Sequence, residues 1–487
     1  MKLLNATPNK ARSALLLLVS AFLLLGAVGC ANRPINPAID KIELQKGYRF
    51  LNLDRFENGK MPETLVVLAF SGGGTRAAAF SYGVLEALRD IELVESNGRK
   101  VRAIDQVNFI TGVSGGSFTA LAYGLHGEKL FDFYDADFLK RDVQGELISR
   151  AVNPVNWTNL ASTGWGRSEL AAELYDEILF HGATYGDLPK RNSPFVLASG
   201  TDISSGAGFA FDQDFFDYLC SDVYGVPLAR AAASSSAVPF ILSPVTYNNY
   251  AGQCKFIEPD YLHYFGSSAN APRPAARLIK SMQDLKAYHD QKDNPYIHVV
   301  DGGLADNLAM RELLEFLEGL EAMQLAGLST PFDGVKRIIV VVVNSLSSPE
   351  TSWNRSVNGP GSIDLLIKAT GVPIDHYSYE EVETLKDTQA RWNGMRKLRK
   401  SKLFTSNKDP VLAKIVNTPD IDLYAVNVAF NMLDDKAEYE YLNSLPTSFS
   451  LPPEAVDRLR AAAKKIILSS PEVQKIMKDD NMRIVKQ

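Results

Sequence analysis

The sequence predicts an α/β protein in which a mainly parallel central sheet is flanked by helices. Three observations lead to this prediction. Residues 65–70 form a continuous apolar segment, as expected of a strand that is buried on both faces. Strand and helix patterns then alternate along the chain as far as the apolar run at 335–343. Glycine-rich turns stand where two of the early strands pass into helices.

The first 29 residues have the layout of a secretory signal and are not expected to belong to the fold. A basic leader at 2–12 precedes an almost wholly apolar run at 14–25, and small residues follow at 26–29. The apolar run is short for a spanning helix, which needs roughly 20 residues. We therefore expect residues 1–29 to be removed as a signal peptide.

Cys30 directly follows these small residues, in a pattern that resembles the signal of a bacterial lipoprotein. In such signals the cysteine becomes the lipidated first residue, so the resemblance implies that Cys30 anchors the chain in the cell envelope. Ala31 behind it resembles the sorting signal for the outer membrane, facing the periplasm. Residues 30–62 would then form a tether. The alternative is an ordinary cleaved signal with an incidental cysteine.

Composition limits the partners of this chain. Its 487 residues allow two or three domains, and the formal net charge of -6 argues against nucleic acid as a partner. Beyond Cys30 only Cys220 and Cys254 remain, with no Cys-x-x-Cys pair and no Cys/His cluster of the metal-binding type. In an oxidising compartment these two could form a disulfide, but two separate buried thiols fit the sequence equally well.

The first strand leads into a turn with three consecutive glycines. Residues 71–76 read Ser-Gly-Gly-Gly-Thr-Arg, and the residues that follow can form a helix. Because no side chain covers them, the backbone N–H groups of Gly72, Gly73 and Gly74 can point at a developing negative charge. The turn is therefore a candidate oxyanion hole, to which Arg76 would add positive charge.

A dinucleotide-binding site is the alternative reading of this turn, because Gly72 and Gly74 also fit the glycine positions of that fingerprint. The fingerprint expects an acidic residue about 20 positions further on, at the end of a second strand. Glu92 and Glu95 are roughly placed, but residues 90–100 lack the clean pattern of a strand. This disfavours the dinucleotide interpretation.

A second turn of this kind holds a serine. An apolar, β-prone run at 107–110 is followed by Gly112-Val113-Ser114-Gly115-Gly116 and then by residues that can continue as a helix. This is the strand, turn and helix context of a G-x-S-x-G nucleophile elbow. In such an elbow Gly112 and Gly116 avoid collisions with the neighbouring strand and helix, and we expect Ser114 at an exposed turn near a helix N-terminus.

A nucleophilic serine needs a proton acceptor, and the sequence offers two kinds. Asp301 lies in Val-Val-Asp-Gly-Gly at the end of an apolar strand predicted over 297–300, where ligands collect in open α/β sheets. A carboxylate there can act as base if burial raises its pKa from about 3.9 towards neutrality. The alternative is a histidine, although none has a strong catalytic context. The six histidines are His126, His181, His263, His289, His298 and His376.

Three motifs of this chain occur in the order found in a known family. They are Gly72-Gly73-Gly74-x-Arg76, Gly112-x-Ser114-x-Gly116 and Asp301-Gly302-Gly303. This order resembles the patatin-like phospholipase family, whose acyl hydrolases use a Ser-Asp dyad. The resemblance implies a three-layer patatin-like fold, with Ser114 as nucleophile, Asp301 as base, and the glycine turn with Arg76 as oxyanion hole.

Shorter matches at 185–188, 198–202 and 233–239 support the resemblance. Two positions depart from it. Ser71 stands where an aspartate often precedes the glycines, and Ala77 stands where a glycine often follows the arginine. Neither departure removes a member of the dyad, but an altered entrance leaves the class of substrate open.

The resemblance covers roughly residues 65–345, so we assign 63–345 to the catalytic domain. Within it, residues 128–190 are rich in aromatic side chains and form either a helical cap over the site or an ordinary packing layer. Residues 346–487 are expected to be a mostly helical C-terminal extension. Their basic run at 396–400 could touch anionic lipid headgroups, although such a run is more often a solvated helix face.

The resemblance implies a lipid acyl hydrolase of the phospholipase A or lysophospholipase type, which forms an acyl-serine intermediate and needs no metal or other cofactor. Its expected partners are membrane lipids, with phospholipid or lysophospholipid as substrate. Two alternatives stay open: a lipid-binding or scaffold lipoprotein without activity, and an esterase for small esters or thioesters. A scaffold would have no physical need for both dyad residues together with three loop glycines.

Overall fold

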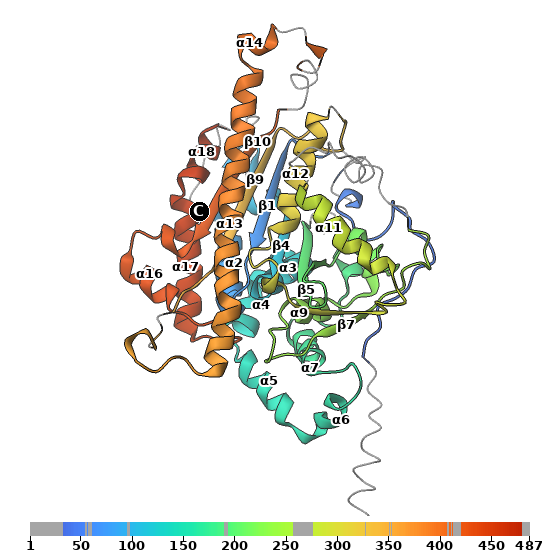
Figure 1. Cartoon of the computed structure of the whole chain (residues 1–487). Helices are drawn as coiled ribbons and strands as arrows, with labels where there is room; N and C mark the ends of the chain where they lie inside the picture. The colour runs from blue at the N-terminus through green and yellow to red at the C-terminus, as the bar shows by residue number, and fades with distance from the viewer. Residues whose placement is uncertain are drawn as a thin grey trace, which may run out of the picture.

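The computed structural model describes residues 33–53, 56, 61–94, 98–188, 193–256, 276–326, 328–349, 351, 353–406, 409–410, 412 and 420–479. The predicted signal segment 1–29, Cys30 and His263 lie outside the described residues. Within the described part, helices flank a central sheet, and the long helix α13 crosses in front of it (Figure 1). The predicted architecture of a mainly parallel sheet flanked by helices is confirmed.

The central sheet has eight strands, and the strands on one side of it are all parallel. In spatial order these are β10 (Asp422–Ala429), β9 (Arg337–Asn344), β1 (Thr64–Phe70), β4 (Val107–Val113) and β5 (Phe195–Asp202). Beyond β5 the sheet becomes antiparallel. This part comprises β8 (Tyr296–Asp301), β7 (Val245–Asn248) and the short β6 (Gly208–Ala210), which pairs with β5.

The helices of the catalytic region connect and cover these strands. They are α2 (Gly74–Asp90), α3 (Gly115–His126), α4 (Leu130–Tyr134), α5 (Val143–Val152), α6 (Trp157–Leu160), α7 (Arg167–Tyr175), α8 (Gln213–Phe216), α9 (Leu228–Ser235), α11 (Ala276–Lys286) and α12 (Arg311–Leu325). Because helices cover both faces, the central strands are apolar nearly throughout. Phe70 of β1 and Val343 of β9, for example, are fully buried.

The C-terminal region shares the core of the catalytic region. It contains α13 (Ser362–Arg399), α14 (Lys402–Thr405), α16 (Lys436–Asn443), α17 (Pro453–Ser469) and α18 (Pro471–Asp479), in addition to strand β10. Helix α17 packs so closely on α2 that a methyl group on Gly83 would lie 2.6 Å from the Arg460 carbonyl oxygen. The sequence analysis expected a mostly helical extension and missed the strand that joins the central sheet.

The basic run at the end of α13 has acidic partners on the body of the protein. Arg396 pairs with Asp422, and the Lys400 ammonium lies 2.9 Å from the Asp420 carboxylate. These pairs join the end of the helix to the start of β10. No helix in the described part of the chain combines the length and the hydropathy that a bilayer-spanning segment requires.

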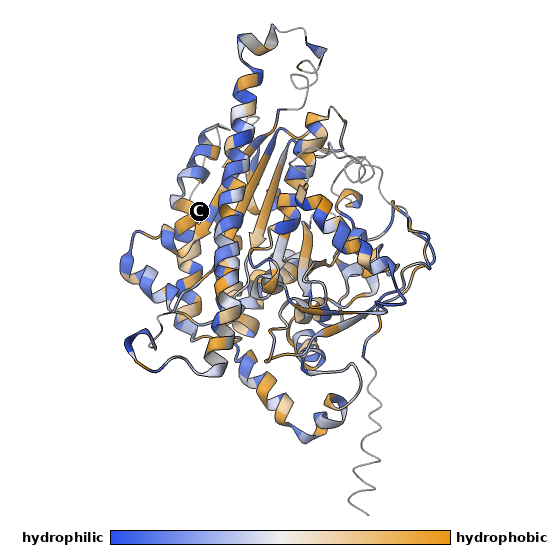
Figure 2. Ribbon diagram, in the orientation of Figure 1, coloured by the Kyte–Doolittle hydropathy of each residue, from blue (hydrophilic) through white to orange (hydrophobic). Residues whose placement is uncertain are grey.

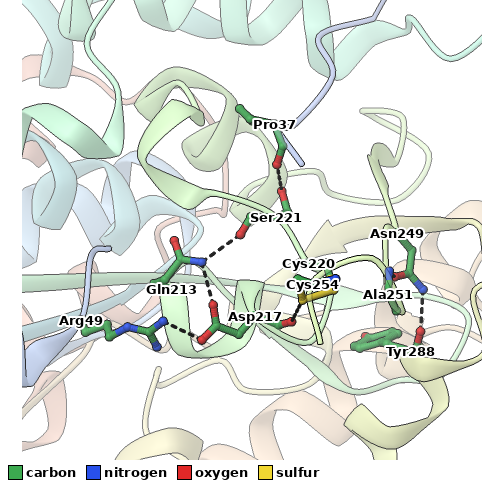
Figure 3. The surroundings of a disulfide bond; sticks show 10 residues. All are labelled: Pro37, Arg49, Gln213, Asp217, Cys220, Ser221, Asn249, Ala251, Cys254 and Tyr288. Carbon is green, nitrogen blue, oxygen red and sulfur yellow. Dashed lines mark hydrogen bonds and ion pairs between the residues drawn. A yellow bond between two sulfur atoms is a disulfide. The ribbon is translucent and has the colours of Figure 1, made fainter. Parts of the chain in front are cut away.

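The segment 33–53 packs against the body, whereas the sequence analysis expected a tether. The Tyr48 ring is buried and stacks on Phe195 with a centroid distance of 4.5 Å, and its hydroxyl accepts the Val196 N–H at 2.8 Å. The Arg49 guanidinium pairs with the Asp217 carboxylate at 2.6 Å (Figure 3). An aromatic ring and an ion pair buried together hold this segment in place.

Cys220 and Cys254 form a disulfide. The sequence had left open whether these two cysteines pair or remain separate thiols. The bond closes a loop beside the N-terminal segment (Figure 3). There the Ser221 hydroxyl donates to the Pro37 carbonyl at 2.7 Å, and the Ile39 N–H donates to the Cys220 carbonyl at 2.9 Å. The disulfide loop and the start of the described chain therefore brace each other.

Helix α7 is an internal packing element, while α5 and α6 project from the body (Figure 1). The Glu169 carboxylate of α7 pairs with the Arg230 guanidinium of α9 at 2.9 Å, and both side chains are at least 96% buried. The same guanidinium donates to the Thr246 carbonyl at 2.8 Å and lies over the Tyr247 ring. This buried pair joins the region 128–190 to the helix that supports the site described below.

We expect Glu169→Ala to destabilise the fold by about 3–5 kcal/mol, because it leaves the buried Arg230 charge without its partner. The control is Glu63→Ala, which removes the partner of Lys336 in a pair whose two side chains are each 70% exposed. An exposed pair is worth at most about 1 kcal/mol. Urea denaturation of the three proteins measures both losses of unfolding free energy. Equal losses would contradict the assignment of the α7–α9 pair as structural.

Candidate active site

The predicted elbow is present at the end of β4. Ser114 joins the strand to α3 with φ 49° and ψ −121°, a backbone conformation that residues other than glycine rarely adopt. Its neighbours must be small. A methyl group on Gly116 would lie 2.5 Å from the Phe70 carbonyl oxygen, and one on Gly112 would lie 2.9 Å from the Gly116 carbonyl oxygen. The turn at Ser114 therefore requires glycine at positions 112 and 116.

The structure brings the two predicted dyad residues together. The Ser114 hydroxyl donates a hydrogen bond of 2.8 Å to Oδ2 of Asp301, which is the last residue of β8. The two residues are 187 positions apart in sequence. Both are buried, with 5% of Ser114 and 8% of Asp301 exposed. The serine is therefore buried, and the sequence prediction of an exposed turn is wrong on this point.

Several hydrogen bonds hold Asp301 in its orientation. Its second carboxylate oxygen accepts the Gly303 N–H at 2.8 Å. Its backbone N–H donates to the Ala237 carbonyl at 3.0 Å, and its own carbonyl accepts the Thr201 hydroxyl at 2.9 Å. Oδ1 is thus held by the turn, which leaves Oδ2 directed at Ser114.

Burial raises the pKa of the Asp301 carboxyl to about 6, although the hydrogen bonds from Gly303 and Ser114 favour its charged form. A carboxyl with a pKa in this range is ionised at neutral pH and can still bind a proton without great cost. This is the property that a general base requires.

The glycine turn lies directly against the elbow. A methyl group on Gly115 would lie 2.0 Å from the Gly74 carbonyl oxygen, and one on Gly72 would lie 3.4 Å from the Ser114 Cβ. Gly73 and Gly74 have positive φ values of 136° and 61°, which a residue with a side chain would adopt only under strain. The two loops can approach each other only because both consist of glycine at the contact.

The three amides of the turn are not equivalent. The Gly72 N–H donates to the Asn307 carbonyl at 2.8 Å. Among the hydrogen bonds of the described residues, none is donated by the N–H groups of Gly73, Gly74 or Gly115. These three amides, unlike the one on Gly72, therefore have no hydrogen-bond acceptor within the described part of the chain. The sequence analysis did not distinguish between the glycines.

Arg76 follows the glycine turn and makes several hydrogen bonds to distant parts of the chain. Its guanidinium is buried and donates to the Ser345 carbonyl at 2.8 Å, to the Leu445 carbonyl at 2.8 Å and to the Thr447 hydroxyl at 3.1 Å. It therefore ties the first turn of α2 to the C-terminal region, while its Nη2 would lie 2.9 Å from a methyl group on Gly73, so that its positive charge stands beside the glycine turn. Its part in an oxyanion hole stays a prediction. A buried guanidinium needs acceptors, and the backbone carbonyls of residues far along the chain supply them.

The described histidines have other surroundings. His126 ends α3, about 18 Å of helix away from Ser114, and its Nε2 lies 2.8 Å from the Leu179 carbonyl oxygen. The His298 ring pairs with the Thr246 hydroxyl at 3.0 Å, and the His289 ring stacks on Tyr218. His181 lies near His126, and His376 is exposed on α13. These positions favour Asp301 over a histidine as the partner of Ser114.

Two residues of the site escaped the sequence analysis. The Ser235 hydroxyl of α9 accepts the Ser114 N–H at 2.9 Å and donates to the Ser199 carbonyl at 2.6 Å, so it fixes the elbow to β5. Asn307 lies between the two glycine turns, because a methyl group on Gly72 would lie 2.5 Å from its Oδ1 and one on Gly303 would lie 3.0 Å from it. Ser235 lies within the matched segment 233–239 and Asn307 lies shortly after the Asp301 turn, but only their contacts reveal a role.

The alternative of a dinucleotide site has no support in this geometry. Residues 90–100 contain β2 (Glu92–Val94), which pairs with β3 (Lys100–Arg102) in a separate antiparallel hairpin. The fingerprint requires a second parallel strand beside the first. Among the described residues, no group of three or more His, Cys, Asp and Glu side chains is placed to hold a metal ion.

The site combines a serine elbow with a buried carboxyl that accepts its hydrogen bond, an arrangement typical of hydrolases that use a serine nucleophile. The family model of the patatin-like phospholipases matches residues 68–314, which is half of the chain. The chain belongs to this family, whose members hydrolyse lipid esters. No curated protein sequence matches it significantly.

Several solved structures resemble the chain at low identity. Human GIVD cytosolic phospholipase A2 in complex with methyl gamma-linolenyl fluorophosphonate is 13% identical, with a TM-score of 0.40 over 85% of this chain and 60% of that one. VipD from Legionella pneumophila is 12% identical, with a TM-score of 0.29 over 95% and 74% of the two chains. The type III effector ExoU is 14% identical, with a TM-score of 0.22 over 86% and 79%. The alignment spans 60% of the human protein's length, and the family assignment rests on the family model alone.

We expect Gly115→Ala to push the glycine turn away from the elbow, because the new methyl group would overlap the Gly74 carbonyl. Overpacking of this kind costs about 1–3 kcal/mol of unfolding free energy. Gly394→Ala is the matched control, since Gly394 lies within α13 and nothing is within 4 Å of an added methyl group. That control should be neutral or stabilising by up to about 1 kcal/mol. Thermal denaturation of both variants tests the contact, and equal midpoints would contradict it.

Proposed function

We propose that this chain is a lipid acyl hydrolase of the phospholipase A or lysophospholipase type, with Ser114 as nucleophile and Asp301 as general base. One observation carries this proposal: the Ser114 hydroxyl donates a 2.8 Å hydrogen bond to a buried carboxylate whose pKa is raised to about 6. A serine in such a contact can lose its proton as it attacks an ester. Membership in a family of lipid-ester hydrolases supports lipid as the substrate class.

The reaction follows from these two groups. Asp301 takes the proton from Ser114 while Oγ bonds to the acyl carbon of the ester. The tetrahedral intermediate collapses, the ester C–O bond breaks, and Asp301 returns the proton to the leaving alcohol. Water then attacks the acyl-serine, again losing its proton to Asp301, and the fatty acid leaves as Ser114 recovers its hydrogen.

The negative charge of the intermediate needs hydrogen-bond donors. In this proposal the amides of Gly73, Gly74 and Gly115 supply them, since they belong to the two turns that contact each other at Gly74 and Gly115 and make no other hydrogen bond among the described residues. Gly115 is also the first residue of α3, where the helix dipole favours negative charge. Loss of one such donor costs roughly 100- to 1000-fold in rate.

The proposal includes a place in the cell. Lipidation of Cys30 would anchor the chain to the envelope, with the outer membrane facing the periplasm as the expected site. The support is the signal-like composition of residues 1–29, together with a disulfide between Cys220 and Cys254 that suits an oxidising compartment. Mass spectrometry of the purified full-length protein, before and after Cys30→Ala, tests the lipid.

Reaction with a fluorophosphonate tests the nucleophile. We expect one covalent adduct in the parent protein by intact mass and none in Ser114→Ala, because the probe reacts only with an activated serine. Asp301→Asn should slow labelling at least about 100-fold, since a positioned base contributes about 10²–10⁴. An adduct in Ser114→Ala would place the nucleophile elsewhere. A folded parent without any adduct would favour the lipid-binding or scaffold alternative.

The labelling rate should also depend on pH. Asp301 must be ionised to accept the serine proton, and burial raises its pKa to about 6. The carboxyl is protonated below this value, so we expect the rate to fall about tenfold per pH unit below pH 6 and to level off above it. Stopped labelling reactions between pH 4 and 9 measure the profile. A midpoint near the ordinary aspartate value, or the same midpoint in Asp301→Asn, would contradict the role of this carboxyl.

A further inference from the structure

Two segments of the chain expose large apolar side chains: residues 148–157, which precede α7, and the loop after α9, which Ser243 joins to the start of α7. We propose that they form a surface that docks on a lipid bilayer, so that the chain acts on the membrane to which Cys30 would anchor it. The surface, here named the docking face, consists of Ile148, Val152, Val155 and Trp157 of the projecting segment and of Phe240 and Ile241 in the loop after α9. The proposal rests on the proposed function and names the physical form of its substrate.

The first segment exposes large apolar side chains on a part of the chain that stands away from the body. Ile148 and Val152 lie four residues apart on α5 and so share one face of the helix. They are 57% and 63% exposed, and Val155 and Trp157 beyond them are 77% and 57% exposed. Figure 2 shows hydrophobic bands along the projecting α5. An indole at the edge of an apolar patch suits a membrane interface, where one part of the ring meets lipid and its N–H meets water.

The second segment exposes an aromatic side chain on a strained backbone. Phe240 is 67% exposed and Ile241 is 59% exposed. Phe240 also has a φ of +70°, a strained conformation that is rare for a bulky residue. The loop therefore combines a strained backbone with an apolar ring that is in contact with water. Contact with lipid would stabilise this arrangement, because it removes the ring from water.

This second segment is adjacent to the dyad. The Ala237 carbonyl accepts the Asp301 N–H at 3.0 Å, and Phe240 follows only three residues later, within about 11 Å along the chain. On its other side, Ser243 accepts the Ser168 N–H at 3.1 Å and joins the loop to the start of α7. The docking face and the buried Ser114–Asp301 pair are thus parts of one connected region.

The start of the described chain lies against the same region. The Arg33 side chain packs on Gly164, where an added methyl group would lie 2.7 Å from Arg33 Cδ, and its guanidinium donates to the Thr246 carbonyl at 3.1 Å. Gly164 belongs to the loop that follows Trp157 and α6. Only two residues separate Arg33 from Cys30, so the three Cα–Cα steps reach at most about 11 Å. A lipid on Cys30 would therefore enter the bilayer close to the docking face.

The distribution of charged residues favours a lipid bilayer over a protein as the partner of the docking face. Residues 147–168 contain two charged side chains, Arg150, which pairs with Glu177, and Arg167, and residues 231–254 contain none. Bilayer docking requires surfaces of this kind, because a carboxylate would have to lose its hydration or face anionic headgroups. Specific protein partners are usually recognised with the help of charged and hydrogen-bonding groups at the rim. A lipid bilayer is therefore the partner that agrees with the expected lipid anchor, with the exposed apolar side chains and with the distribution of charge.

The experiment uses the full chain with Cys30→Ala, which cannot be acylated, and vesicles of phosphatidylethanolamine and phosphatidylglycerol in a 3:1 ratio. Sedimentation measures how the protein partitions. We expect Val155→Ser with Trp157→Ser, and separately Phe240→Ser, to weaken partitioning about tenfold or more, as loss of a buried apolar side chain predicts. Leu398→Ser is the matched control, since Leu398 is 56% exposed at the far end of α13 and should have no effect.

Two further readouts separate this proposal from the proposed function. Brominated acyl chains in the same vesicles should quench the fluorescence of the parent, and Trp157→Phe should remove most of that quenching. Hydrolysis of a soluble short-chain ester should be unchanged in all the variants. Partitioning without any hydrolysis would overturn the proposed function alone. Unchanged partitioning in the face variants, an equal loss in Leu398→Ser, or self-association of the chain through this face would overturn the docking face.

Discussion

Ser114 and Asp301 meet across a strand, and the geometry of the site depends on this crossing. They end β4 and β8, which are not neighbours, because β5 lies between them in the sheet. Strands two places apart are separated by about 10 Å, so the side chains can touch only if the intervening strand carries nothing large between them. There β5 has Ser199 and Gly200, and a methyl group on Gly302 would already lie 2.5 Å from the Ser199 carbonyl oxygen. Small residues at the end of β5 make the dyad possible.

The same requirement for close approach extends to the C-terminal region. A methyl group on Gly74 would lie 2.2 Å from the Ser448 carbonyl oxygen, and the Thr75 N–H donates to that carbonyl at 2.8 Å. Arg76 adds hydrogen bonds to the Leu445 carbonyl and the Thr447 hydroxyl. The turn that frames Ser114 is therefore held from the elbow on one side and from residues 445–448 on the other. Residues beyond the matched family region thus support the site.

Much of the site could be predicted from the sequence because its chemistry is confined to short motifs. The serine between glycines, the triple glycine and the Asp-Gly-Gly turn each indicate a local backbone conformation that few other residues allow. Arg76 could not be assigned in this way, since its position depends on acceptors about 270 and 370 residues further along the chain. Ser235 lies in a matched segment and Asn307 does not, but the role of each depends on contacts that the sequence does not reveal. The strand β10 was missed because its apolar residues stand among helical segments.

The sequence by itself determined the layered α/β class, the elbow, the glycine turn and the candidate base, because periodicity and turn chemistry are local properties of the chain. Only the tertiary structure decided that Asp301, and not a histidine, lies against Ser114, that Gly72 has its amide occupied, and that Cys220 and Cys254 are joined. It also decided the burial that raises the pKa of Asp301. Each of these depends on distances between residues far apart in sequence, and these distances exist only once the sheet and its helices have packed.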